Sequence, residues 1–504
     1  MTTAHPSSEP AMTAPPPSLP ASPYEREARK DFGDWISPLL VKELRQALRS
    51  RIFISVFLIL QVALVYFVIQ YAFAEQTSDR FLVFFWLIVG LALLLLVPLM
   101  GTSAVASEFG GSKLELLTLS RTSARGIVRG KWLALYGQAL LMAVTLLPYM
   151  VIRYYVGDVQ LVQEMQTLTF LLLASAVLTA GAIALSTIRN RALRFILSVG
   201  AFVGLVSLTL GWGFQAALRP SGDVLEGSFW LTLGWGLLFA IPTVLLLWEM
   251  AASQFAPLAE NHETPKRLLG FFVVFASLAL TALDYRVELT TTIVVVVLAL
   301  ISVDAILRDP VPIATIYRPF VRRGMLARLS GRLLLYPGDA SGVLYVSVTW
   351  TLLLGVSYLL RGDYQDPRDF IAIAVLPATV GMFIIPAAIR VFWRPRSIPA
   401  FWQFVLIHVA FALLSGLLAD QADNSNTTFL AGFIPTLYLS VAPDIVVRSL
   451  TVPTVISIAM TGVSLAICLI GRRPVFSAFL NLERAADDLN QRAVLEAAQT
   501  SPKP

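Results

Sequence analysis

Long runs of Leu, Val, Ile, Phe and Trp, separated by short charged segments, dominate this chain. The hydrocarbon core of a membrane is about 30 Å thick, and a helix needs on the order of 20 apolar residues to cross it. The alternation of apolar and polar positions that is typical of strands is absent, so the runs predict helices. By this measure the chain has about twelve spans, near 52–73, 81–104, 132–152, 168–188, 193–217, 229–251, 269–283, 290–307, 343–360, 369–393, 399–419 and 452–471.

The distribution of Lys and Arg predicts the orientation, because basic residues are retained on the cytoplasmic side. With twelve spans and a cytoplasmic N-terminus, few of the 38 basic residues lie on the outer side; they are Arg80, Arg153, Arg219, Arg286, Arg361, Arg368 and Arg448. We therefore expect an all-α integral membrane protein whose N- and C-termini are both cytoplasmic.

A further apolar stretch at 428–447 has two interpretations. It could form a thirteenth span, or a re-entrant hairpin on the outer side just before the last span. A thirteenth span would move the basic residues of the C-terminal tail to the outside, against the retention of positive charge. We favour twelve spans, with 420–451 as a segment that remains on the outer side of the membrane.

The predicted spans are arranged as six plus six. Each half has a pair of spans, a long basic cytoplasmic loop, a second pair, a short Arg-rich loop and a last pair. The long loops are 105–131 and 308–342. We predict a disordered Pro- and Ser-rich tail over 1–35, a first six-helix half over 36–265, a second six-helix half over 266–474, and a cytoplasmic helix and tail over 475–504.

Composition agrees with this architecture and narrows the function. Hydrophobic residues make up 57% of the chain and charged residues 14%, against about 45–50% and about 25% in soluble domains. The net charge of +6 follows from the excess of Lys and Arg in the predicted cytoplasmic segments, where these residues face anionic lipid headgroups. We therefore expect membrane lipids, and no nucleic acid, as partners. Cys468 is the single cysteine, which excludes an internal disulfide and a thiolate metal cluster.

The segment 107–131, SEFGGSKLELLTLSRTSARGIVRGK, combines charge and paired glycine between two apolar spans. Ser112 and Glu115 have the spacing of a capping box, which predicts a short helix. Leu114 and Leu117 share one face of that helix, so it is amphipathic. We predict a helical elbow at the membrane surface; an interfacial helix that only lies in the headgroups would show the same pattern.

Local signals also mark helix starts and kinks. Beyond the elbow, Thr122 or Ser123 can cap the helix that leads into the third span. Pro148 in the third span, and Pro377 and Pro386 in the tenth, each remove a backbone donor. We expect a kink at each of these prolines.

Polar residues inside the spans are few, namely Gln61, Gln138, Asp304, Gln403 and His408. A lone histidine with no second His nearby favours a hydrogen-bonded packing residue over a metal ligand. Asp304 and Arg308 have the four-residue spacing of a salt bridge, which we favour over a proton relay; Asp444 and Arg448 repeat the spacing. No residues form a pattern typical of catalysis, so we expect no enzyme activity and no catalytic or metal site on this chain.

Two segments carry a resemblance to a known family. The first is the elbow segment, with an acidic residue, glycine, LELL, a Ser-containing turn and IV-x-GK; the second is KELR, before the first span. Together they resemble the permease subunits of type-2 ABC exporters, over roughly residues 37–155. The residues that match are Lys42, Glu43, Arg45, Glu108, Gly111, Leu114 to Leu117, Ser120, Ile127, Val128, Gly130 and Lys131.

The resemblance implies a transmembrane permease that works with a separate ATPase subunit, in a multi-pass arrangement in a bacterial cell (inner) membrane. It implies no cofactor on this chain and ATP-Mg on the partner, and indeed no G-x-x-x-x-G-K-[ST] motif occurs. A homodimer or a second permease chain could complete the path. The residues expected to couple the permease to the ATPase are Lys42, Glu43, Arg45, Glu108, Gly111, Lys113, Leu114, Glu115, Leu117, Ser120 and Lys131.

Two other classes of protein remain open from the sequence. A secondary transporter would work without ATP and would use charges inside the membrane for ion coupling; the scarcity of such charges argues against it. A polytopic lipid-modifying enzyme would need clusters of His, Asp or Arg at the membrane interface. The transported substrate is not indicated, and export is the direction that the resemblance implies.

Overall fold

The computed structural model describes residues 38–73, 79–105, 123–157, 160–188, 229–257, 259–283, 287–360, 375–393, 398–422, 428–441 and 451–500, with residues 194 and 200. Within these ranges the chain is helical and has no strand. Eight of the described helices are long and apolar enough to cross a membrane. They lie in Arg51–Gln70, Phe84–Gly101, Ala124–Tyr155, Leu161–Ser186, Glu263–Ala282, Asp339–Leu360, Ala400–Leu418 and Thr451–Gly471.

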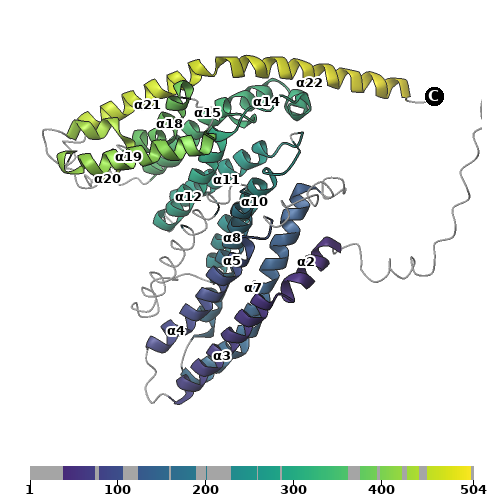
Figure 1. The fold of residues 1–504 in the computed structure, drawn as a ribbon, viewed down its shortest axis with the longest axis vertical. Helices are drawn as coiled ribbons and strands as arrows, with labels where there is room; N and C mark the ends of the chain where they lie inside the picture. Colours follow the sequence, from purple (N-terminus) through teal and green to yellow (C-terminus); the bar gives the residue numbers. More distant parts are fainter. Residues whose placement is uncertain are drawn as a thin grey trace, which may run out of the picture.

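The first part of the chain forms an elongated bundle (Figure 1). Its elements are α2 (Pro38–Leu48), α3 (Arg51–Phe73), α4 (Asp79–Gly90) with the π-helical η1 (Leu91–Leu96) and α5 (Val97–Gly101), α7 (Ala124–Gly157), α8 (Leu161–Ser186) and α10 (Phe229–Ala252). The predicted fifth span at 193–217 lies outside the described residues, apart from positions 194 and 200.

The second part packs beside the first at an angle (Figure 1). Its elements are α11 (Glu263–Ala282), α12 (Val287–Leu307), η2 (Ala314–Ile316), α13 (Arg318–Arg322), α14 (Met325–Ser330), η3 (Gly331–Leu335), α15 (Asp339–Thr351), η4 (Leu352–Val356), α16 (Ser357–Leu360), α18 (Leu376–Phe392), α19 (Ala400–Ala422), η5 (Thr428–Phe433), α20 (Pro435–Val441), α21 (Thr451–Gly471) and α22 (Arg473–Thr500).

The apolar runs locate the helices but not their ends. Besides the eight long helices, three shorter apolar helices in the described residues, Gly236–Ala252, Val294–Leu307 and Leu376–Phe392, coincide with predicted spans. Several helices extend beyond the apolar run, because a helix continues where its polar residues find partners. The arrangement of twelve spans as six plus six stays a prediction.

The ambiguous stretch at 428–447 contains a 3₁₀ helix, η5, and the seven-residue helix α20. At 1.5 Å per residue, seven residues extend only about 10 Å, far less than the hydrocarbon core. Both elements pack against α18, α19 or α21. The described part of this stretch is therefore not a thirteenth span; residues 442–447 lie outside the description.

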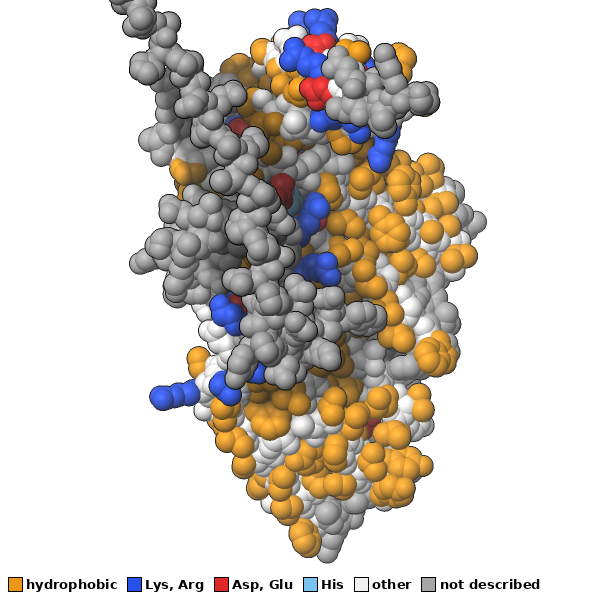
Figure 2. Space-filling model, turned by 90° about the vertical axis from the view of Figure 1, so that its right-hand side faces the viewer, with side chains coloured by type: hydrophobic (Ala, Val, Ile, Leu, Met, Phe, Trp, Pro, Cys, Tyr) orange, Lys and Arg blue, Asp and Glu red, His pale blue; other side chains and the backbone are white. Residues whose placement is uncertain are grey.

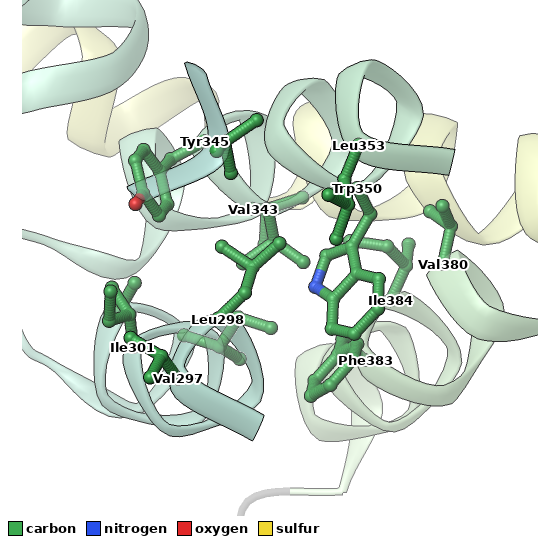
Figure 3. Packing of buried hydrophobic residues seen from close by; sticks show 14 of the residues in the cluster. Val297, Leu298, Ile301, Val343, Tyr345, Trp350, Leu353, Val380, Phe383 and Ile384 are labelled. Atoms are coloured by element: carbon green, nitrogen blue, oxygen red, sulfur yellow. The ribbon is translucent and has the colours of Figure 1, made fainter. Parts of the chain in front are cut away.

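The core of the second part lies between α12, α15 and α18, where large apolar side chains interdigitate (Figure 3). Trp350 stacks on Phe383 with ring centroids 5.3 Å apart, and its indole Nε1 donates to Ser302 Oγ at 2.9 Å. α12 and α15 pack very closely at Gly342, where an added Cβ would lie 2.0 Å from the carbonyl oxygen of Ala305. A side chain at this position would force the two helices apart.

The prolines have different roles. Pro148 and Pro386 lie inside α7 and α18, as expected. Pro377 lies in the first turn of α18, whose N-cap is Val375. The expectation that Pro377 kinks a helix interior is wrong here, because the first turn of a helix needs no partner for that nitrogen.

Helix α22 folds back over the loop between α12 and α15. Phe479 packs with Tyr317 and Tyr336, whose ring centroids are 6.1 and 5.4 Å from it. The Tyr336 hydroxyl donates to Glu483 Oε1 at 2.8 Å. The sequence predicted a helix over part of 475–504; the structure shows a helix whose described part packs on this chain's own loop.

Candidate functional site

The two segments that carry the family resemblance meet where α2 packs along α7 (Figure 1). α2 is amphipathic, with Leu44 directed toward α7 and Lys42 and Arg45 exposed. Gly137 of α7 makes the contact close, since a Cβ there would lie 3.2 Å from Leu44 Cδ1. We call this contact the α2–α7 clamp, formed by Glu43, Leu44, Ala47, Lys131, Gly137 and Gln138.

An ion pair lies at the centre of the clamp. Lys131 Nζ is 3.3 Å from Glu43 Oε2, and the exposed fractions of the two side chains are 8% and 17%. A charge this well buried is costly without a partner, so each residue stabilises the other in place. Two helical turns along α7, Gln138 Nε2 donates to the carbonyl of Ala47 at 2.6 Å. The same carbonyl also accepts from the Ser50 backbone nitrogen at 3.2 Å, so the Gln138 bond ties α7 to the C-terminal turn of α2.

The start of α7 is the point where the predicted elbow would join the bundle. The Gly126 backbone nitrogen donates to Ser123 Oγ at 3.2 Å, so Ser123 is the capping residue and that prediction is confirmed. In the same first turn Arg125 holds Glu249 of α10 through two bonds of 2.7 and 3.1 Å. Whatever displaces the first turn of α7 therefore acts on α10 as well.

The elbow itself lies outside the described residues, which resume at Ser123. The predicted coupling residues that fall there are Glu108, Gly111, Lys113, Leu114, Glu115, Leu117 and Ser120. Of the other four, Glu43 and Lys131 are brought together, while Lys42 and Arg45 are exposed. The capping box of Ser112 and Glu115 stays a prediction.

From Glu249 the polar contacts continue into the second part through His262. The imidazole Nδ1 lies 2.7 Å from Glu249 Oε2, and Nε2 lies 3.1 Å from Glu260 Oε2. The ring therefore bridges a carboxylate of α10 and a carboxylate of the segment that leads into α11. His262 could not be predicted as a bridging residue from the sequence, because its partner Glu249 is on another helix.

A second group of charges joins the start of α11 to the end of α12. Arg308 Nε lies 3.3 Å from Asp304 Oδ1, which confirms the predicted salt bridge, and 3.0 Å from Glu263 Oε1. Lys266 completes the group by bonding to both Glu263 and Asp304. Burial acts to lower the pKa of the Arg308 guanidinium, but the nearby carboxylates outweigh it and the pKa is raised. Arg308 thus stays charged at neutral pH.

These contacts and one more lie at the ends of α7, α10, α11, α12, α15 and α21, and we call this set of residues the charged end. It comprises Arg125, Glu249, His262, Glu263, Lys266, Asp304, Arg308, Asp339 and Arg472, the last two bonded at 2.9 Å. In Figure 2, Lys and Arg side chains gather in the upper half and along the middle of the face shown, above a broad hydrophobic surface. Such a division is typical of a membrane protein whose polar side chains lie at the water boundary.

One ion pair lies away from the charged end. Arg153 of α7 and Glu164 of α8 are 2.8 Å apart, with side chains only 4% and 3% exposed. The guanidinium also lies over the ring of Phe85, 4.1 Å from its centroid. Arg153 was predicted to lie on the outer side of the membrane, and Glu164 was not predicted to be its partner. The signal was available, since a glutamate in the first turn of an apolar helix requires a partner.

The polar residues predicted inside the spans have structural partners. Gln61 bonds to Thr145 and Tyr149 at 2.8 and 2.9 Å. His408 Nδ1 lies 2.9 Å from the carbonyl of Phe404 and its ring lies against the Phe404 ring, which confirms a packing role. Among the described residues no group of three His, Cys, Asp or Glu is placed to hold a metal ion. Asp444 and Arg448 lie outside the description.

No protein-family model, no curated protein and no solved structure matches this chain.

Proposed function

We propose that this chain is the membrane-spanning permease subunit of an ATP-driven ABC exporter, and that separate ATPase subunits bind and hydrolyse the ATP-Mg. In this proposal it is a multi-pass protein of a bacterial inner membrane, with twelve spans as six plus six and both termini in the cytoplasm. The observation that supports the proposal most is the Glu43–Lys131 ion pair. Its two residues come from the two separate segments that carry the family resemblance.

The clamp suggests how force from an ATPase would enter the bundle. A push on residues 106–122 would act on the first turn of α7, immediately after Ser123. α2 would move with α7 because Glu43 and Gln138 tie them together. α3 would follow, because only two residues separate the end of α2 at Leu48 from the start of α3 at Arg51. Arg125 and Glu249 would pass the movement to α10. Rigid-body tilting of packed helices is a known route to alternating access.

The test is photo-cross-linking in the native membrane. A photoreactive group on Glu115→Cys, in a chain whose native Cys468 is replaced by Ala, is expected to capture a protein that carries a phosphate loop and no membrane span. The same group on Ala485→Cys, on the exposed side of α22, is the control and captures no such protein. The purified complex is expected to hydrolyse ATP. A chain whose Glu115→Cys site captures no ATPase, and which co-purifies with none, contradicts the proposal.

One observation favours a second candidate, an ATP-independent secondary transporter. Arg153 and Glu164 form a nearly fully buried ion pair between two apolar helices, and ionisable residues inside membranes often serve ion coupling. Proteoliposomes of the purified chain, without ATP, decide between the two. Proton flux that a pH gradient drives and Glu164→Gln abolishes supports the secondary transporter. No flux in either variant supports the ABC permease.

A further inference from the structure

The loop between α12 and α15 has two unlike sides. One side, with Tyr317, Phe320 and Tyr336, is covered by α22. The other side displays Met325, Leu326, Leu329 and Leu333, and the first two are 84% and 83% exposed. Met325 and Leu326 precede Leu329 by four and three residues, and Leu333 follows it by four, so the apolar side chains gather on one side of this segment. We call them the 325–333 stripe. Large apolar side chains gathered in this way mark an interaction surface rather than ordinary solvent exposure.

The position of the stripe restricts what can cover it. Leu333 immediately precedes Leu334, whose carbonyl accepts from Arg267 of α11 at 2.8 Å. Arg267 also donates to the carbonyls of Tyr336 and Gly338 at 2.8 and 2.9 Å. These bonds hold the loop against the first turns of α11, just where its apolar stretch begins. The stripe therefore lies at the level where the apolar helices meet water.

The charge around the stripe is positive. Arg318 and Arg322 donate to the amide oxygen of Asn490 at 2.9 and 3.1 Å; Asn490 is neutral, so both positive charges remain. Arg323 is exposed beside them. Arg328 differs, since Asp487 compensates it at 3.0 Å. An excess of arginine next to exposed apolar residues is complementary to an anionic lipid surface.

We propose that the 325–333 stripe inserts into the headgroup region of the bilayer leaflet at the charged end, with the exposed Arg322 and Arg323 binding anionic lipid headgroups. α22 then acts as the outer cover that presses the loop onto the membrane. A protein partner would need an acidic surface at this same level; the position of the stripe at the ends of apolar helices favours lipid. The inference holds whether or not the chain is an ABC permease.

The test measures where the stripe lies in vesicles that contain the full chain. A nitroxide is attached to Leu326→Cys in the Cys468→Ala chain, and its collisions with oxygen and with a water-soluble nickel chelate are compared. Ala485→Cys on the exposed side of α22 is the aqueous control, and Val62→Cys, on an exposed position of α3, is the lipid control. In vesicles of phosphatidylcholine with phosphatidylglycerol, the Leu326 label is expected to resemble the Val62 label.

The charge part of the proposal has its own test. Arg322→Gln with Arg323→Gln is expected to shift the Leu326 label toward water. The ratio of lipid-buried to water-exposed label should fall roughly fivefold for each arginine removed at low salt. The matched control is Arg484→Gln with Arg492→Gln on the exposed side of α22, which is expected to leave the ratio unchanged. An equal shift in both pairs shows a general charge effect and contradicts specific binding of lipid headgroups by the loop.

Two results would overturn the insertion itself. In the first, the Leu326 label is as accessible to the nickel chelate as the Ala485 label, with and without phosphatidylglycerol. In the second, the label is accessible in vesicles but becomes protected when a purified ATPase subunit is added, which assigns the stripe to a protein partner. Circular dichroism of each variant checks that the helices are retained.

Discussion

Glu43 and Lys131 are 88 positions apart in the chain and 3.3 Å apart in space. The pair joins a helix that precedes the first apolar span to the helix that enters the third. Because both side chains are largely buried, neither can be changed alone without leaving a charge without its partner in a poorly hydrated contact.

We predict that Glu43→Lys releases α2 from α7. Two positive charges would face each other in the clamp, and the lost pair would destabilise the contact by about 2 kcal/mol. The expected result is faster cleavage by protease near residues 48–51 in detergent, with the bundle intact. The double variant Glu43→Lys, Lys131→Glu restores the pair and is expected to restore protection. If the double variant is as sensitive as the single one, the ion pair does not hold the clamp.

Packing at Gly137 gives a second and uncharged test of the clamp. Gly137→Leu places a large side chain where Leu44 already lies within 3.2 Å of an added Cβ, so α2 is expected to detach as it does in Glu43→Lys. Gly416→Leu is the control, because an added Cβ at Gly416 has open space around it. Protease protection at α2 is expected to fall in the first variant and to stay unchanged in the second.

The sequence predicted contacts between residues that are close together in the chain, but not contacts between residues on different helices. The apolar runs predicted the helices, because a membrane imposes one length and one polarity on every crossing. Local contacts were also predicted, such as the Ser123 cap and the Asp304–Arg308 pair, since these partners are three or four residues apart. Lys266, which bonds to Asp304 from another helix, was not predicted. The resemblance named Glu43 and Lys131 separately, but nothing in the pattern indicated that they touch.

The buried ion pair of Arg153 and Glu164 should contribute more to stability than the exposed pair of Arg125 and Glu249. Glu164→Gln leaves an arginine that is 4% exposed facing a neutral amide, at a cost of about 3–5 kcal/mol. Arg125 is 47% exposed, so Arg125→Gln is expected to cost under about 1 kcal/mol. Thermal unfolding in detergent measures both.

A double substitution checks that explanation. Arg153→Met with Glu164→Leu replaces both charges by apolar groups and is expected to recover most of the loss, because no buried charge remains. A double variant as unstable as Glu164→Gln would show that packing, and not the charge, is what these two side chains provide.

The close approach of α12 and α15 predicts a large effect from one methyl group. Gly342→Ala would put its Cβ 2.0 Å from the Ala305 carbonyl, and the helices must separate, at about 1–3 kcal/mol. Gly462→Ala is the control in α21, where an added Cβ meets nothing within 4 Å; it is expected to be neutral or to stabilise by up to about 1 kcal/mol. The thermal midpoint should fall only in the first variant.

The contact of α22 with the loop should weaken in alkaline solution. Burial, and then the hydrogen bond to Glu483, raise the pKa of the Tyr336 phenol above its ordinary value of 10.0. The folded form thus holds this proton more tightly than the unfolded form does. The resulting stability is complete below about pH 10 and declines as the pH rises toward the folded pKa. Fluorescence energy transfer between labels on α22 and α19 should show release above pH 10, with a smaller pH dependence in Tyr336→Phe.

The cover that α22 places over the loop also determines an order of events during synthesis. The loop of Tyr317 and Tyr336 leaves the ribosome long before Phe479 and Glu483, which complete its packing. At a translation rate of about 5–20 residues per second, this aromatic surface therefore stays uncovered for several seconds before α22 is synthesised. A nascent chain that stalls before Phe479 keeps the surface open, and this is the stage at which a chaperone or a quality-control protease would recognise an unfinished molecule.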